Sequence, residues 1–114
     1  MQMTSPFATV IVNYGIGNLG SIRNMLKHLS LPATISSDEK VIGAAKRLIF
    51  PGVGAFDPGM ENLRKSGLIP VLEQKVLHEK IPILGICVGM QLFAEGSEEG
   101  NQIGLGWIKG KVIR

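Results

Sequence analysis

Cys87 is the residue whose type and surroundings most clearly predict chemistry. It is the single cysteine of the 114 residues and stands between Gly85 and Gly89 in the pattern G-x-C-x-G, after the apolar run "IPILGI". Small neighbours relieve crowding where a strand turns sharply into a helix, so the sulfur is presented rather than buried. The helix start favours the thiolate, and the backbone N–H of Val88 can donate to an oxyanion. We therefore favour a nucleophile over the alternative, a small buried core cysteine.

A second loop can complete an oxyanion site. "PGVG", residues 51–54, follows the apolar run "RLIF". The strand that it ends is the neighbour of the cysteine strand in the usual winding, so its peptide N–H groups can face the sulfur. Gly52 and Gly54 let this backbone turn or flip.

Neither histidine of the chain is placed to act as the base. His28 is expected at the end of the first helix and His78 near the end of the helix before the cysteine strand. Both positions lie at the amino edge of the strands. The cysteine strand spans roughly 13 Å at about 3.3 Å per residue. A histidine at the amino edge therefore lies far beyond hydrogen-bond reach of Cys87.

The glycine loop "NYGIGNLGS", Asn13 to Ser21, has a different possible ligand. Gly15, Gly17 and Gly20 have the G-x-G-x-x-G spacing of a dinucleotide-binding turn, and Asp38 follows 18 residues later, near the place of a ribose-binding acid. The alternative is a tight strand-to-helix turn that uses glycines for their conformational freedom.

Short apolar runs alternate with helical periodicity, which predicts an α/β fold: a doubly wound, flavodoxin-like, mostly parallel sheet with flanking helices and strand order 2-1-3-4. Asn18 is expected to cap a first helix whose apolar residues pack against the sheet. Asp57 and Pro58 are expected to start a helix that Gly67 interrupts. The expected strands span 8–13, 32–36, 47–50, 81–86 and 111–113; the expected helices span 19–30, a short piece within 36–46, 57–66, 70–80 and 88–94, with a loop at 95–104.

Composition excludes several classes of protein. The formal charge is +3, and the 12 Lys and Arg are scattered, so we expect no nucleic-acid partner. One cysteine cannot form an internal disulfide or a cysteine-based zinc cluster. The N-terminus has no basic signal region and the first apolar stretch is too short to span a membrane, so we expect a cytoplasmic protein without membrane contact.

Four motifs together resemble a known family. "PGVGAFDPGM", "LGICVGMQLF", "SEEG" and "GLGW", in this order and spacing, resemble the class I glutamine amidotransferases. The "PGVG" segment and "NYGIGNLGS" are most similar to the glutaminase subunits of imidazole glycerol phosphate synthase, which act in histidine biosynthesis. The resemblance covers essentially the whole chain.

The resemblance implies that L-glutamine is hydrolysed and that the ammonia passes to a partner cyclase of (β/α)8-barrel fold. It implies that Cys87 forms a γ-glutamyl thioester, with the N–H groups of Val53 and Val88 as oxyanion donors. Gly52, Gln91 and Glu99 match positions that bind the substrate, and a carboxylate such as Glu99 can pair with the α-ammonium group of glutamine. No metal or organic cofactor is implied, because thioester chemistry needs only a thiol, a base and oxyanion donors.

The chain departs from the family in one respect. The family's catalytic histidine and glutamate stand in an "H-P-E"-like segment that these 114 residues do not contain. We therefore interpret residues 1–114 as the N-terminal, nucleophile-bearing half of one amidotransferase domain, inactive alone. Its strand edges and apolar helix faces are expected to be uncovered, which predicts poor stability or aggregation.

Two alternatives stay open. The chain could be a paralogue that feeds ammonia to a sugar-modifying partner in surface-polysaccharide synthesis, or a non-catalytic nucleotide-binding module that uses Gly15, Gly17 and Gly20. Under the amidotransferase hypothesis, Ile16 and Asn18 are expected at the partner-facing edge, where they would convey cyclase occupancy to the Val53 peptide.

Overall fold

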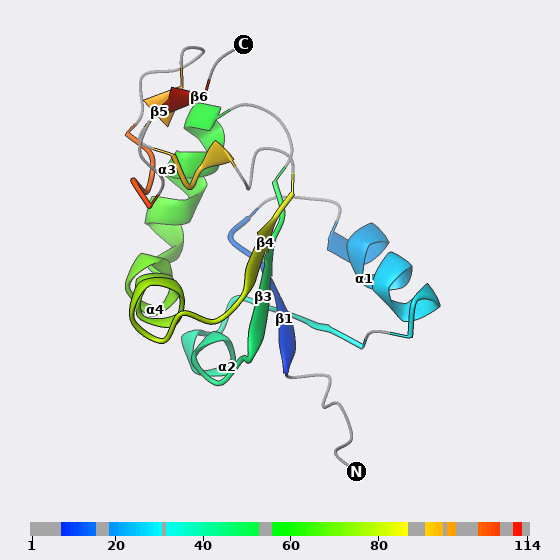
Figure 1. Cartoon of the computed structure of the whole chain (residues 1–114). Coiled ribbons are helices and arrows are strands. Elements are labelled where there is room, and N and C mark those ends of the chain that lie inside the picture. The colour runs from blue at the N-terminus through cyan, green and yellow to red at the C-terminus, as the bar shows by residue number, and fades with distance from the viewer. Residues whose placement is uncertain are drawn as a thin grey trace.

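The chain forms a four-stranded parallel sheet with helices on both faces (Figure 1). The structure, a computed structural model, describes residues 8–15, 19–30, 32–52, 56–86, 91–94, 96–97, 103–107 and 111–112. The strands are β1 (Thr9–Val12), β2 (Thr34–Ser36), β3 (Arg47–Phe50) and β4 (Ile83–Gly85). Their order is β2-β1-β3-β4 and every neighbouring pair is parallel, as the sequence predicted.

The central strands are apolar on both faces. In β1 and β3 the last three residues of each strand are buried, whereas every residue of the edge strand β2 is only half-buried. Such continuous apolar runs are typical of parallel strands that are covered on both sides.

Three short helical segments and one longer helix cover one face of the sheet. They are α2 (Glu39–Gly43), α3 (Phe56–Ser66), α4 (Ile69–Glu73) and the π-helix η1 (Gln74–His78). Among the described residues, α1 (Leu19–His28) is the one helix on the other side (Figure 1). The main core lies between the sheet and the first group. Its buried members are Val10, Val12, Tyr14, Ile42, Ala45, Leu48, Phe50, Phe56, Met60, Leu63, Leu68, Leu72, Leu92 and Phe93.

Helix α1 flanks the sheet, as predicted, but packs against it only loosely. No residue of α1 is buried. Met25 in the helix is 52% exposed, and Leu29, which follows the helix directly, is 63% exposed. The helix contacts mainly the edge strand β2. The apolar periodicity therefore identified the helix correctly, but not how deeply it is buried.

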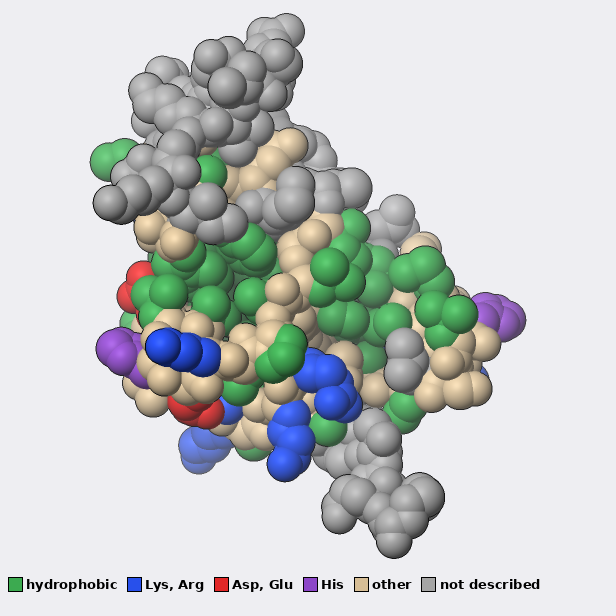
Figure 2. All heavy atoms as spheres, in the orientation of Figure 1, with side chains coloured by type: hydrophobic (Ala, Val, Ile, Leu, Met, Phe, Trp, Pro, Cys, Tyr) green, Lys and Arg blue, Asp and Glu red, His purple; other side chains and the backbone are tan. Residues whose placement is uncertain are grey.

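The α1 side of the sheet is partly open. Ile11 and Ile49 alternate with the core residues along their strands and so belong to this second face. A largely apolar hollow of about 310 Å³ lies there, and Leu84 in the edge strand β4 is 59% exposed. The hollow is lined by Thr9, Leu26, Arg47, Leu48, Ile49, Pro82, Ile83 and Leu84. Hydrophobic side chains also gather across the middle of the face shown in Figure 2.

The start of helix α3 differs from the prediction. Helix α3 begins at Phe56, before the expected cap Asp57, so Asp57 and Pro58 lie inside its first turn. Phe56 is buried in the core, and packing of this ring outweighs the local start signal. Gly67 ends α3 with φ +74°, and Pro70 stands in the first turn of α4, as expected.

A second, two-stranded parallel sheet pairs β5 (Gly96–Ser97) with β6 (Lys111–Val112). The strand near residue 111 was predicted. β5 falls in a segment predicted as a loop, because a two-residue strand has no periodicity that a sequence could reveal.

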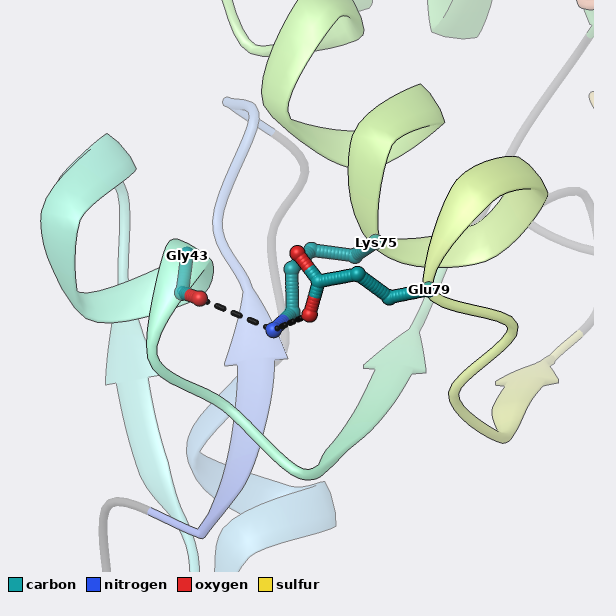
Figure 3. A network of polar contacts seen from close by, with 3 residues as sticks. All are labelled: Gly43, Lys75 and Glu79. Atoms are coloured by element: carbon teal, nitrogen blue, oxygen red, sulfur yellow. Dashed lines mark hydrogen bonds and ion pairs between the residues drawn. The ribbon is translucent and has the colours of Figure 1, made fainter.

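A buried lysine joins two elements of the covered face (Figure 3). Lys75 of η1 is only 4% exposed, and its Nζ donates to the carbonyl oxygen of Gly43 in α2 at 2.8 Å. The same Nζ lies 2.7 Å from Oε1 of Glu79, and this contact lowers the pKa of that carboxyl. The charge of the lysine is thus paired and hydrogen-bonded, as burial requires.

Candidate functional site

Strands β3 and β4 end side by side. Phe50 is paired with Gly85, and the N–H of Ile86 donates to the carbonyl oxygen of Phe50 at 3.0 Å. Pro51 and Gly52 follow Phe50 directly and are both buried. The end of the cysteine strand therefore lies against the start of the "PGVG" loop, as the strand order predicted.

Only part of the predicted site falls within the described residues. Gly52 is buried beside the end of β4, and Gln91 is half-buried at the first described position after it. The remaining predicted site residues, Ile16, Asn18, Val53, Cys87, Val88 and Glu99, lie outside the described residues.

The segment after the cysteine packs closely against α3. Leu92 and Phe93 are buried, and a Cβ added to Gly59 of α3 would lie 3.4 Å from the methyl carbons of Leu92. The glycine in "DPGM" therefore allows α3 to approach the chain that carries Gln91. This close packing against α3 helps to fix the position of the segment that carries Gln91.

The "GLGW" motif braces the same segment, a role that the sequence analysis did not predict. The N–H groups of Leu105 and Gly106 donate to the carbonyl oxygens of Leu92 and Ala94, at 2.8 and 3.0 Å. A Cβ at Gly104 would overlap the carbonyl oxygen of Ala94 and lie 3.0 Å from the ring of Phe56. The spacing of two glycines before a tryptophan was the available signal for such a close approach.

Four aromatic rings form a row beside the site. The ring pairs Tyr14–Phe50, Phe50–Phe93 and Phe93–Trp107 have centroid separations of 4.7, 5.5 and 5.2 Å. The indole N–H of Trp107 donates to Oε2 of Glu73 in α4 at 3.4 Å. The row joins the end of β1, the end of β3 and the segment after β4.

Tyr14 also makes a direct bond to the "PGVG" loop. Its hydroxyl donates to the carbonyl oxygen of Pro51 at 2.5 Å, and both groups are buried. Burial raises the pKa of the Tyr14 phenol above its ordinary value, so the hydroxyl keeps its proton. This bond places Tyr14, near the start of the glycine loop, beside the start of the "PGVG" loop.

A polar hollow of about 480 Å³ lies beside Tyr14, between the ends of β1 and β2 and helix α3. It is separate from the junction of β3 and β4. Its lining residues are Asn13, Tyr14, Gly15, Ser37, Asn62, Lys65 and Ser66.

The family model for class I glutamine amidotransferases matches residues 10–112. The chain belongs to this family. The match spans both sheets and all the described helices, so the fold expectation and the family resemblance are confirmed together.

Several curated relatives of this amidotransferase chain carry the same name. A protein of Methanococcus maripaludis named imidazole glycerol phosphate synthase subunit HisH 2 is 50% identical over 104 residues, which are 91% of this chain and 52% of the relative. A protein of the same name from Pseudomonas aeruginosa is 47% identical over 105 residues, 92% of this chain and 52% of the relative. The chain thus spans about half the length of the curated relatives it matches.

The amidotransferase fold also appears in the solved structures. A crystal structure of a glutamine amidotransferase matches with a TM-score of 0.76 at 24% identity, covering 92% of this chain and 56% of the other. At this identity the likeness supports the fold alone.

In this amidotransferase the glycine loop lacks two features of a dinucleotide site. Gly20 lies in α1, and a Cβ there would meet nothing within 4 Å, whereas the third glycine of a dinucleotide fingerprint permits close helix–strand packing. Asp38 caps α2 by accepting a hydrogen bond from the N–H of Lys40 at 2.8 Å. The nucleotide-binding alternative is therefore not favoured. Gly15, at φ +93°, does need glycine for the turn itself, and Gly17 lies outside the described residues.

The two histidines are exposed at the ends of α1 and η1, a few residues before β2 and β4 begin. They lie toward the amino edge of the sheet, as predicted, and not beside Pro51 and Gly52. Within the described ranges, no group of three or more His, Cys, Asp or Glu side chains could hold a metal ion. No helix among those residues is long and apolar enough to cross a membrane.

Proposed function

We propose that residues 1–114 form the nucleophile-bearing half of a glutaminase that supplies ammonia for imidazole glycerol phosphate synthesis. One observation carries the proposal: the class I amidotransferase model matches residues 10–112, a range that includes Cys87, two residues after β4 in the sequence. The names of the curated relatives support the histidine pathway over a surface-polysaccharide pathway.

In the proposed reaction, the Cys87 thiolate attacks the side-chain amide carbon of glutamine and forms a tetrahedral oxyanion. The N–H groups of Val53 and Val88 stabilise this oxyanion. The C–N bond then breaks, the nitrogen takes up a proton and ammonia leaves, so that a γ-glutamyl thioester remains. Water hydrolyses the thioester to glutamate and restores the thiol.

The proton transfers need a base close to Cys87. His28 and His78 lie toward the other edge of the sheet. We assign this task to the histidine and glutamate of the "H-P-E"-like segment that the family resemblance implies. The chain on its own is then expected to be inactive as a glutaminase.

Gly52, Gln91 and Glu99 are proposed to bind the substrate. Two features of the described residues support this part. The buried Gly52 lies where β3 and β4 end together, and Gln91 belongs to the segment that α3 and the "GLGW" loop hold in place.

The proposed acceptor of the ammonia is a cyclase subunit of (β/α)8-barrel fold. Ile16 and Asn18 are proposed to face this partner and to transmit its occupancy to the Val53 peptide. The bond between Tyr14 and Pro51 supports such a connection, because it joins the start of the glycine loop to the start of the "PGVG" loop.

The decisive experiment is labelling of Cys87 by a glutamine analogue that carries an electrophilic ketone. It is carried out on the complete glutaminase in the presence of the cyclase subunit. The complete glutaminase is this chain joined to the part of the relatives' sequence that the chain does not cover. We expect one equivalent of label on Cys87, protection by excess L-glutamine and none by D-glutamine. The same preparation should release ammonia from L-glutamine.

The matched control is Cys87→Ser, which should abolish both labelling and ammonia release while leaving the fold intact by circular dichroism. Absence of labelling in the complete protein, or labelling that Cys87→Ser does not remove, would overturn the proposed function.

A further inference from the structure

Tyr14 joins the two loops that frame the proposed site, yet neither the family match nor the relatives' names assign it a role. It comes two residues after β1, and its phenol oxygen reaches across to the carbonyl of Pro51, 37 positions away in sequence. Gly15 follows at φ +93° and its N–H donates to Oδ1 of Asn13 at 3.2 Å, so a tight turn sets the direction of the chain around Tyr14.

The ring of Tyr14 has little freedom to move. It is stacked on Phe50 with an interplanar angle of 6° and a centroid distance of 4.7 Å, and Phe50 is itself fully buried. Close packing of this kind holds the phenol oxygen in one place. The hydroxyl is therefore a fixed anchor rather than an adaptable one.

The anchor acts on one particular peptide. The carbonyl of Pro51 and the N–H of Gly52 belong to the same planar unit, so fixing the oxygen also fixes the direction of that N–H. The next peptide along the chain contains the N–H of Val53, and the backbone dihedrals of Gly52 are the pivot between the two. A defined plane before the pivot limits the orientations that the following peptide can adopt.

We propose that Tyr14 is a positioning residue of the glutaminase: its hydroxyl holds the Pro51–Gly52 peptide so that the oxyanion donor after Gly52 is correctly oriented. This inference rests on the proposed function. Tyr14 touches no substrate and acts through the backbone of the "PGVG" loop.

The test is Tyr14→Phe in the complete glutaminase with its cyclase, because this change removes the hydroxyl and keeps the stacked ring. We expect kcat for glutamine hydrolysis to fall about tenfold, the size expected from loss of one buried hydrogen bond, with KM unchanged within twofold. The affinity for an aldehyde analogue of glutamine, which forms a tetrahedral adduct with the thiol, should fall by a similar factor.

A second readout separates orientation of the oxyanion donor from general damage. Alkylation of Cys87 by iodoacetamide passes through no oxyanion, so its rate should be the same in Tyr14→Phe and wild type. Lys75→Met is the matched control, because it also removes a buried donor to a backbone carbonyl, but near the other end of the strands. It should lower the melting temperature without changing kcat or aldehyde affinity.

The outcomes are distinguishable. If wild type releases no ammonia and Cys87 is not labelled, the proposed function fails and Tyr14 has no site to orient. If wild type is active and Tyr14→Phe keeps kcat and aldehyde affinity within twofold, the positioning role is wrong. An equal loss in alkylation, or in the Lys75→Met control, would assign Tyr14 to stability alone.

Discussion

At the scale of single residues, two glycines differ in the space around them, and only one of them belongs to the "GLGW" loop. Gly104 faces the backbone of Ala94 and the ring of Phe56, with no room for a side chain. Gly20 lies in the exposed helix α1, where an added Cβ would meet nothing within 4 Å. The same residue type therefore has a packing role at one position and none that the structure explains at the other.

We predict opposite effects of alanine at these two positions. Gly104→Ala should lower the free energy of unfolding by about 3 kcal/mol, because the new methyl group overlaps main-chain atoms that cannot move aside alone. Gly20→Ala should raise it by about 0.5–1 kcal/mol, because alanine loses less backbone entropy in a helix. Urea unfolding of both variants checks the pair. A Gly104→Ala protein as stable as wild type would show that the loop does not brace the segment after the cysteine.

At the scale of elements, the ammonium group of Lys75 links η1 to α2. The group is buried, and its partners are the carbonyl of Gly43 and the carboxylate of Glu79. The free energy of hydrophobic contacts across this junction depends little on orientation. The hydrogen bond to Gly43, in contrast, requires a defined distance and angle. The lysine therefore helps to set how the two short helical segments meet.

We predict that Lys75→Met lowers the free energy of unfolding by about 1–3 kcal/mol, since the Gly43 carbonyl loses a buried donor. Glu79→Gln should change stability little at neutral pH, because the carboxylate lies at the surface and is screened by water. Thermal unfolding of both variants provides the comparison. Equal losses would mean that the ion pair within the η1 turn, and not the bond to Gly43, accounts for the stabilisation.

The same pair predicts a dependence on pH. Lys75 lowers the pKa of Glu79 in the folded state, so the contact stabilises the fold above the ordinary pKa of a glutamate. This contribution should be lost as the pH falls through the lowered pKa and Glu79 is protonated. NMR titration should show the pKa of Glu79 rising toward its ordinary value in Lys75→Met. An unchanged titration would contradict the assignment of the shift to Lys75.

At the scale of the whole molecule, one face of the sheet is far better covered than the other. The α2, α3 and α4 side encloses the main core, whereas α1 leaves an apolar hollow and an exposed Leu84 on its side. Exposed apolar surface at an edge strand favours association with other chains. The expectation of uncovered apolar surface is thus confirmed for the described residues.

We predict that the isolated chain of 114 residues self-associates through this face. Leu84→Lys should reduce the associated fraction in analytical ultracentrifugation at micromolar concentration, because a charge placed in the hollow opposes burial. Ile103→Lys is the matched control, since Ile103 is 72% exposed but lies in a loop away from the hollow. A monomeric wild-type chain would contradict the prediction, and so would an equal reduction of the associated fraction by both variants.

Much of the fold could be predicted from local patterns. The apolar runs of β1 and β3 and the periodicity of α1 are properties of consecutive residues. The strand order followed from general rules of parallel α/β sheets. The predicted start of α3 was wrong because burial of Phe56, a tertiary effect, outweighed the cap signal of Asp57.

The candidate site divides in the same way. The sequence alone determined that Cys87 stands in a nucleophile pattern and that "PGVG" follows a neighbouring strand, because both are carried by residue type and spacing. Only the tertiary structure decided that Tyr14 bonds to Pro51 and that "GLGW" supports the segment after β4. The physical reason is distance along the chain: these contacts join residues from 10 to 37 positions apart, and no local propensity encodes where two such segments meet.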